Sequence, residues 1–274
     1  MLKQRFITAI ALIPLVFLAI LYLESSLFKW LVAAVIGLAA LEWFSIIGYN
    51  TNLGRIMTLA LLLAALVLSQ FIQLATIITI SLGFWLAITL LIVSFAHKSL
   101  PAFISRAFQQ KHLALLIAIL ALSLLWISVA ELHSASPLGP KQVLYVMVLV
   151  WLADTGGYFA GKRWGKTALA KAISPNKTWE GVAGAIVLGA IWALLAYQFG
   201  IAGELSLVSW SILSLITLLV SVVGDLFESV FKRLHQIKDS GNLLPGHGGM
   251  LDRVDSLLAA VPVFTAGLYF LGAL

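Results

Sequence analysis

Polar side chains that could bind phosphate or metal are concentrated between residues 225 and 255 of an otherwise very hydrophobic chain. The first of them are spaced so that they share one face of a helix: Asp225, Glu228, Ser229, Lys232 and Arg233. Charges beside runs of membrane-grade hydrophobicity are costly unless they bind or catalyse something. We therefore predict that this segment forms most of the active site.

Two other predicted helix ends bring acids to the same side of the protein. Asp154 lies eight residues before Lys162 on one hydrophobic run, and Asp252 and Asp255 open the last run. Carboxylates from three helices can then face one recessed cavity.

Clustered carboxylates in a low dielectric repel each other unless they are protonated, paired with a base or bridged by a cation. Pairing is the alternative for any single acid, for instance Asp252 with Arg233 or Asp225 with Lys232. For the whole set we favour a hard cation. An all-oxygen ligand set suits Mg²⁺ held by one or two carboxylates and completed by substrate phosphates.

The turn Pro245-Gly246-His247-Gly248-Gly249 offers backbone that can take positive φ and amides that can cradle phosphate oxygens. A plain tight turn would account for the glycines but not for His247. A catalytic role for His247 is therefore a hypothesis.

The loop from residue 161 to 181 carries five basic residues and only Glu180 as an acid, which is typical of a phosphate-binding segment. It is not a P-loop, because only three residues separate Gly161 from Gly165 and the loop follows a helix. The run Ser174-Pro175 before Lys177-Thr178 could equally cap the next helix. Capping and substrate contact are compatible.

Composition excludes an ordinary soluble protein. The 274 residues are 62% apolar and 10% charged, with a mean hydropathy of +1.06, which predicts an all-α polytopic membrane protein. The absence of cysteine excludes disulfides, thiolate nucleophiles and cysteine-bound zinc. The net charge of +6 does not indicate nucleic acid, because the basic residues form no stripe alternating with aromatics. A lipid bilayer and phosphates are the expected partners.

Apolar runs of about 20 residues predict nine transmembrane helices. They cover roughly residues 6–23, 27–48, 56–73, 75–95, 113–130, 142–160, 181–200, 207–228 and 254–273. With the N-terminus cytoplasmic, 15 of the 17 lysines and arginines fall on the inner side and only Lys29 and Lys141 on the outer side. The C-terminus is then outside, and the charged loops face the cytoplasm.

The chain divides by chemistry into two regions. Residues 1–140 form a five-span region in which Glu42 is the one intramembrane charge candidate, interpreted as a structural polar anchor. Residues 141–274 form a four-span catalytic region with cytoplasmic loops 161–181 and 229–253. Within the first region, between the spans predicted at 75–95 and 113–130, residues 97–112 fit either a short amphipathic interfacial segment or a solvated connector.

One long motif resembles the signature of the phosphatidate cytidylyltransferases, or CDP-diacylglycerol synthases: Ser229-x-Phe231-Lys232-Arg233-x4-Lys238-Asp239-x-Gly241-x2-Leu244-Pro245-x-His247-Gly248-Gly249-Met250-x-Asp252-Arg253-Val254-Asp255. Shorter blocks also resemble that family: Asp154-Thr155-Gly156, Ser174-Pro175-Asn176-Lys177-Thr178-Trp179-Glu180-Gly181 and Gly224-Asp225-Leu226-x-Glu228-Ser229. The resemblance covers the second half of the chain.

The resemblance implies transfer of CMP from CTP to phosphatidic acid by a homodimer in a bacterial inner membrane. It implies Mg²⁺, with a second, monovalent cation, on metal ligands drawn from Asp225, Asp252, Asp154 and Asp255. The implied catalytic residues are Asp225, Asp252, Asp255, Lys232, Arg233 and His247. The implied substrate contacts are Lys162, Ser174, Lys177, Thr178, Glu180, Glu228, Ser229, Lys238, Asp239, Gly248, Gly249 and Arg253.

Three alternative functions are compatible with parts of this pattern. Another CTP-using lipid enzyme is one alternative, either a polyprenol kinase, which would release CDP rather than pyrophosphate, or a cytidylyltransferase for a different lipid phosphate. A CDP-alcohol phosphatidyltransferase is disfavoured because its DGxxAR-type motif is absent. An ion-coupled transporter would place its acids near the midplane, whereas these acids gather at the cytoplasmic mouth.

Overall fold

The computed structural model describes residues 13–241 and 248–274. Within these residues, eight helical stretches are long and apolar enough to cross a membrane. They are α2 (Ser25–Ile46), α3 (Asn52–Ser69), α4 (Leu74–Phe95), α6 (Lys111–Ala135), α7 (Gly139–Trp164), α8 (Trp179–Gln198), α9 (Leu207–Leu234) and the stretch formed by α10 (Leu251–Val254) and α11 (Leu257–Phe270). A shorter apolar helix covers Ile13–Tyr22, and the first predicted span begins outside the described residues. The prediction of an all-α polytopic membrane protein is confirmed.

The helices are continuous because a spanning segment must satisfy its backbone polar groups internally in lipid. Hydroxyl caps mark where several of them begin. The side chain of Thr51 accepts a hydrogen bond from Gly54 N at the start of α3, and Ser206 accepts one from Ser209 N at the start of α9. Polar residues therefore set the helix ends, and apolar composition sustains the interiors.

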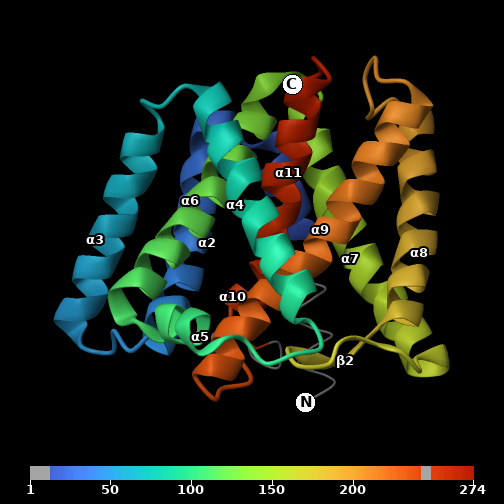
Figure 1. The fold of residues 1–274 in the computed structure, drawn as a ribbon. Helices are drawn as coiled ribbons and strands as arrows, with labels where there is room; N and C mark the ends of the chain where they lie inside the picture. Colours follow the sequence, from blue (N-terminus) through green and yellow to red (C-terminus); the bar gives the residue numbers. More distant parts are fainter. Residues whose placement is uncertain (1–12, 242–247) are drawn as a thin grey trace.

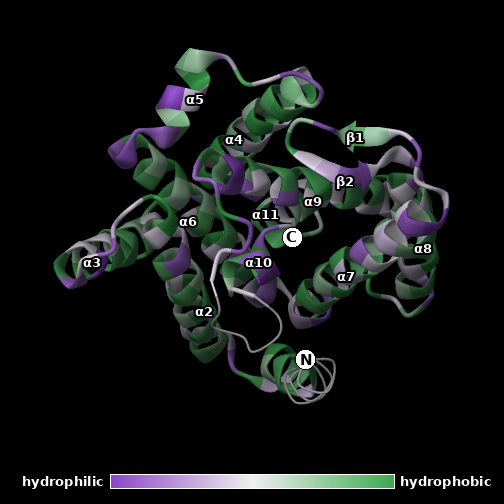
Figure 2. Ribbon diagram, turned by 90° about the horizontal axis from the view of Figure 1, so that it is seen from below, coloured by the Kyte–Doolittle hydropathy of each residue, from purple (hydrophilic) through white to green (hydrophobic). Residues whose placement is uncertain are grey.

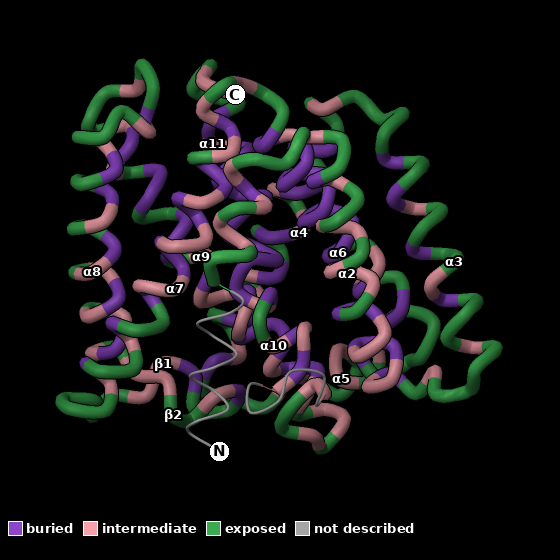
Figure 3. The backbone as a smooth tube through the Cα atoms, turned by 180° about the vertical axis from the view of Figure 1, so that it is seen from behind, coloured by how far each residue is buried: buried purple, intermediate pink, exposed green. Residues whose placement is uncertain are grey.

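The core lies at the centre of the bundle and joins the two regions of the chain. Helix α11 packs against α4, α6, α7 and α9, and buried residues on both sides of residue 140 form one hydrophobic cluster. Helices α3 and α8 lie at opposite flanks (Figure 1). Buried backbone is concentrated in the middle of the molecule, whereas α3 and α8 carry many exposed positions (Figure 3). The exposed apolar side chains of these flanking helices suit contact with lipid.

Helices α7 and α8 approach closely through glycines. A Cβ built on Gly156 would lie only 2.5 Å from the carbonyl oxygen of Gly184, and one on Gly181 would lie 2.9 Å from that of Gly157. Small residues permit such backbone contact between membrane helices. This crossing holds the start of α8 against the face of α7 that carries Asp154.

A two-stranded antiparallel hairpin interrupts the helical fold within the predicted loop 161–181. Its strands are β1 (Ala168–Ala170) and β2 (Ser174–Thr178). The hairpin is tied to the end of α4, because Ala172 N donates to Ala96 O at 3.0 Å and the His97 ring pairs with Ala168 O at 3.0 Å. Strand β2 leads directly into α8 and places its side chains beside α9.

The short predicted segment at residues 97–112 contains a helix, α5 (Ala102–Gln109). Its Phe108 is buried, with a ring centroid 5.1 Å from that of Phe231, while Phe103 is 73% exposed. A helix with one buried and one exposed face agrees with the amphipathic interpretation. The hairpin, α5 and α10 lie at one end of the bundle, and the C-terminus lies at the other (Figures 1 and 2).

Candidate active site

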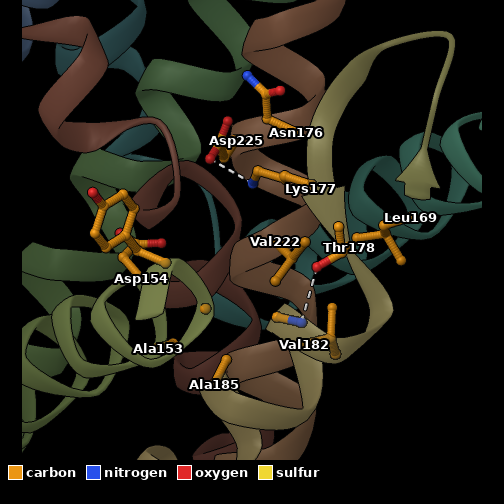
Figure 4. A pocket seen from close by; sticks show the side chains of 13 residues that line it. Ala153, Asp154, Leu169, Asn176, Lys177, Thr178, Val182, Ala185, Val222 and Asp225 are labelled. Carbon is orange, nitrogen blue, oxygen red and sulfur yellow. Dashed lines mark hydrogen bonds and ion pairs between the residues drawn. The ribbon is translucent and has the colours of Figure 1, made fainter. Parts of the chain in front are cut away.

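A cavity of about 330 Å³ opens between α7, β2, the start of α8 and α9. Figure 4 shows Lys177 reaching from β2 toward Asp225 on α9, with Asp154 of α7 on the facing wall. The other lining residues are Ala153, Gly157, Tyr158, Leu169, Asn176, Thr178, Gly181, Val182, Ala185 and Val222. An apolar floor with three convergent charges is typical of a ligand site.

The charges of this cavity interact strongly. The Lys177 Nζ lies 2.5 Å from Asp225 Oδ2, and each side chain is one quarter exposed (25%). Asp154 is repelled by Asp225 and attracted by Lys177 and Arg253. The ammonium of Lys177 thus acts on both carboxylates of the cavity wall, and the guanidinium of Arg253 also acts on Asp154.

A third carboxylate adjoins this pair because α9 passes very close to the bend between α10 and α11. A Cβ on Gly224 would lie 2.6 Å from Asp255 O and 3.1 Å from Ser256 O. Glycine at this position therefore permits the approach. Asp255 accepts a hydrogen bond from Ser256 N at 2.6 Å, and its carboxylate is repelled by those of Asp225 and Glu228.

One turn further along α9 lies a buried charge cluster, which consists of Glu228, Lys232 and Asp252. Lys232 Nζ forms ion pairs with Glu228 Oε2 and with Asp252 Oδ1, the latter at 2.9 Å. The Glu228 side chain is fully buried, and its Oε1 has no partner among the described residues. Because buried charges are costly without a counter-charge, Lys232 is required wherever Glu228 is ionised.

Asp252 also fixes the segment that joins α9 to α10. Its carboxylate accepts hydrogen bonds from Gly249 N at 2.9 Å and from Ser240 N at 3.2 Å. Gly248 has a φ of +80°, and a Cβ there would lie 2.8 Å from Asp252 Oδ2. The predicted use of glycine for a left-handed turn is confirmed at Gly248, while the Gly249 amide is engaged by Asp252.

The ion pairs suggested by sequence spacing have different partners in the structure. Asp252 pairs with Lys232 rather than Arg233, and Asp225 pairs with Lys177 rather than Lys232. Arg233 Nε instead donates to Ile173 O at 3.2 Å and anchors the hairpin turn. Acid–base pairing, the alternative considered for each single acid, is therefore present with other partners. For Asp225 the reason is that the hairpin brings Lys177 to α9, which spacing along single helices does not reveal.

Some of the site residues predicted in the loop 161–181 line the cavity, and others stabilise the loop. Lys177 and Thr178 line the cavity, and the Thr178 hydroxyl also caps α8 by accepting from Gly181 N at 3.1 Å. Glu180 accepts from Thr167 N at 3.2 Å and so holds the loop. Ser174 begins β2 outside the cavity lining. The capping alternative for this run is confirmed, with Thr178 as the cap.

Lys162 contacts a residue of the cavity but does not itself line it. Its Nζ is 3.4 Å from the hydroxyl of Tyr158, a cavity residue that is 60% exposed. Tyr158 and Asn176 are lining residues that were not predicted as site residues. The spacing of Tyr158, four residues after Asp154, is the signal that could have identified it.

The remaining predicted residues have separate surroundings. The Ser229 hydroxyl donates to Asp225 Oδ1 at 3.3 Å. Arg253 interacts electrostatically with Asp154, while Lys238 and Asp239 are exposed. His247 lies outside the described residues.

Within residues 13–241 and 248–274, no three acidic or imidazole side chains lie close enough together to hold a metal ion by themselves. The donor set nevertheless fits a hard cation in part. Asp154 and Asp225 face the cavity, and Asp255 adjoins Asp225. Magnesium is commonly held by one or two carboxylates plus phosphate oxygens.

The fold and site define a multi-pass membrane protein with a charged cavity suited to phosphorylated substrates. The cytidylyltransferase family model matches residues 3–271, and the chain belongs to this family. It is 40% identical to a phosphatidate cytidylyltransferase of Pseudomonas aeruginosa over 99% of this chain and 98% of that protein. It is 37% identical to one of Haemophilus influenzae over 98% and 99%. A Bacillus subtilis relative is 46% identical over 53% of this chain and 52% of that protein.

Replacing the central ammonium of the buried charge cluster tests its role in stability. We expect Lys232→Met to destabilise the folded protein by about 3–5 kcal/mol, because it leaves a buried carboxylate unpaired. Adding Glu228→Gln should recover part of that loss, since it removes the buried charge. The measurement is thermal unfolding in detergent, with Lys141→Met at an exposed position as the control. Equal effects of Lys232→Met and Lys141→Met would contradict this prediction.

Proposed function

We infer that the enzyme transfers the cytidylyl group of CTP to phosphatidic acid, giving CDP-diacylglycerol and pyrophosphate for phospholipid synthesis. The observation that carries this inference is a cavity with paired acidic and basic groups in a chain that matches the cytidylyltransferase family almost end to end. The relatives named phosphatidate cytidylyltransferase, at up to 40% identity over nearly the full chain, support the same reaction.

The chemistry requires little from a general base. The attacking group is a phosphate monoester whose second pKa is about 6, by analogy with phosphoserine, so it is largely dianionic at neutral pH. An oxygen of this phosphate forms a bond to the α-phosphorus of CTP while the bond from that phosphorus to the bridging oxygen breaks. The electron pair leaves with pyrophosphate. The protein must bring two anions together and stabilise the leaving group.

Basic side chains at two positions suit these tasks. Lys177 stands in the cavity wall, where a phosphate can replace Asp225 as its partner. Lys232 lies about two turns beyond Asp225 along α9, where Glu228 and Asp252 hold it. We propose that Lys177 binds a substrate phosphate directly and that Asp252 serves the reaction by holding Lys232.

We propose Mg²⁺ at the carboxylates of Asp225 and Asp154, with Asp255 as an adjoining acid. When bound, Mg²⁺ would neutralise phosphate charge and polarise the phosphorus to be attacked. The charge inventory supports a cation: five carboxylates around the site face three basic side chains, which leaves room for positive charge. The proposal includes the second, monovalent cation that the family resemblance implies.

We also propose that the enzyme resides in a bacterial inner membrane as a homodimer, with its cavity open to the cytoplasm. Bacterial relatives and the strongly asymmetric distribution of lysine and arginine support this location and orientation. CTP is a cytoplasmic nucleotide, and phosphatidic acid is supplied by the bilayer, so a cavity at the cytoplasmic end of membrane helices can receive both.

Product analysis tests the reaction. The purified enzyme should release pyrophosphate from CTP only when phosphatidic acid is added. Asp225→Asn and Asp252→Asn should each reduce turnover at least about 100-fold while remaining folded, because each removes a charge that holds a lysine or a cation. Glu204→Gln, an exposed acid elsewhere, is the control. Release of CDP would indicate a lipid kinase, and wild-type turnover in both site variants would contradict the assigned carboxylates.

Metal removal tests the cofactor. Treatment with EDTA should abolish pyrophosphate release, and Mg²⁺ should restore it, whereas Zn²⁺ should restore little because the proposed ligands are all oxygens. Adding K⁺ to the magnesium-restored enzyme tests the monovalent cation. Full activity in EDTA would contradict the proposed metal.

Cysteine labelling tests the orientation of the protein in the membrane. Because the chain has no cysteine of its own, only an introduced cysteine can react. A membrane-impermeant maleimide applied to intact cells should modify Glu204→Cys, on the short turn between α8 and α9, but not Lys166→Cys, next to the hairpin. After lysis both positions should react, because both are exposed. The reverse pattern in intact cells would place the cavity outside.

A further inference from the structure

Glu42 of α2, in the N-terminal region, reaches into the segment that connects α9 to α10. Its Oε2 accepts a hydrogen bond from Leu251 N at 2.8 Å and another from Ser240 Oγ at 3.0 Å. The other carboxylate oxygen, Oε1, is buried without a partner among the described residues. A side chain more than 190 residues away in sequence thus orders the approach to Asp252.

The same segment is shaped around the Glu42 side chain. A Cβ on Gly241 would lie 2.6 Å from Glu42 Oε1 and 2.8 Å from its Cδ. A Cβ on Gly249 would lie 2.7 Å from Glu42 Cδ. Neither glycine has a positive φ, so space, rather than backbone conformation, explains why no side chain is present at these two positions.

Glu42 and Asp252 both bind Ser240 of this segment. Ser240 donates its hydroxyl to Glu42 and its amide to Asp252. Asp252 in turn binds Lys232 Nζ at 2.9 Å. A continuous series of hydrogen bonds and one ion pair therefore runs from α2 to the buried charge cluster.

We propose that Glu42 is a positioning residue for cytidylyl transfer, which holds the connection between α9 and α10 so that Asp252 keeps Lys232 in place. This inference rests on the proposed function. The sequence-based interpretation treated Glu42 as a structural anchor. The proposal instead gives this residue of the N-terminal region a part in the reaction. The role depends on hydrogen-bond acceptance at Oε2 and does not require the negative charge.

Replacing Glu42 by glutamine distinguishes the need for a hydrogen-bond acceptor from the need for a negative charge. A glutamine can place its carbonyl oxygen at the Oε2 position and its NH₂ group at the Oε1 position, where no described donor would clash. Glu42→Gln should therefore retain turnover within about 3-fold, whereas Glu42→Ala should lower kcat about 100-fold, as small misplacement of catalytic groups does. The KM for CTP should change little, because Glu42 does not line the cavity.

The experiment measures kcat, KM and thermal stability on the monodisperse fraction of each variant in detergent. Glu131→Ala, at another acid of the N-terminal region, is the matched control and should match the wild type. Two outcomes overturn the inference: Glu42→Ala with wild-type kcat per folded molecule and only a lower melting temperature, or Glu42→Gln as inactive as Glu42→Ala. Inactivity of the wild type toward CTP and phosphatidic acid would instead refute the proposed function.

A second variant keeps the test decisive if Glu42→Ala does not fold. Gly241→Ala should displace the Glu42 carboxylate and reduce kcat, whereas Gly37→Ala on α2, where a Cβ meets nothing within 4 Å, should not. Where Glu42→Ala does fold, the double variant with Gly241→Ala should be no less active than Glu42→Ala alone, because the steric conflict has been removed. Wild-type activity of Gly241→Ala would overturn the inference.

Discussion

The rest of the site depends on the two ion pairs that the ammonium group of Lys232 forms. It is the base that neutralises the fully buried carboxylate of Glu228, and it does so inside a hydrophobic bundle. Removing a buried counter-charge leaves an ion with neither water nor partner, so this pair must form whenever the protein folds with Glu228 ionised. Because Lys232 also binds Asp252, the same group ties the end of α9 to the start of α10. The two helix ends are therefore linked through a single positive charge.

Close backbone packing makes this arrangement possible. Gly224 allows α9 to approach the bend before α11, which brings Asp255 beside Asp225. Gly156 and Gly184 allow α7 to approach α8, which places the start of α8 and the preceding strand next to the cavity. In both cases a side chain in place of hydrogen would separate the helices that carry the charges. The glycines therefore determine the distances between acidic and basic groups that are distant in sequence.

Much of the architecture follows from the sequence, because hydropathy and the positions of basic residues reflect the bilayer directly. The helix spacing of Asp225 to Arg233 also predicts their common helix, and α9 does extend to Leu234. Pairing partners could not be predicted in the same way. Lys177 reaches Asp225 only because an unpredicted hairpin folds back over α9, and Glu42 reaches Ser240 only through tertiary packing. Periodicity describes one helix at a time, whereas these contacts depend on how separate helices meet.

The balance of acidic and basic groups in the cavity bears on how it can bind phosphorylated substrates. Two phosphorylated substrates must approach each other at a wall that already holds Asp154 and Asp225, with Asp255 adjoining Asp225. Carboxylates alone would repel both substrates, and Lys177 alone is shared with Asp225. The proposed divalent cation would resolve this conflict, because the acids would become its ligands and Lys177 would be free to bind phosphate. On that proposal, the acids and the lysine of the cavity would form a consistent set for anionic substrates that arrive with a metal.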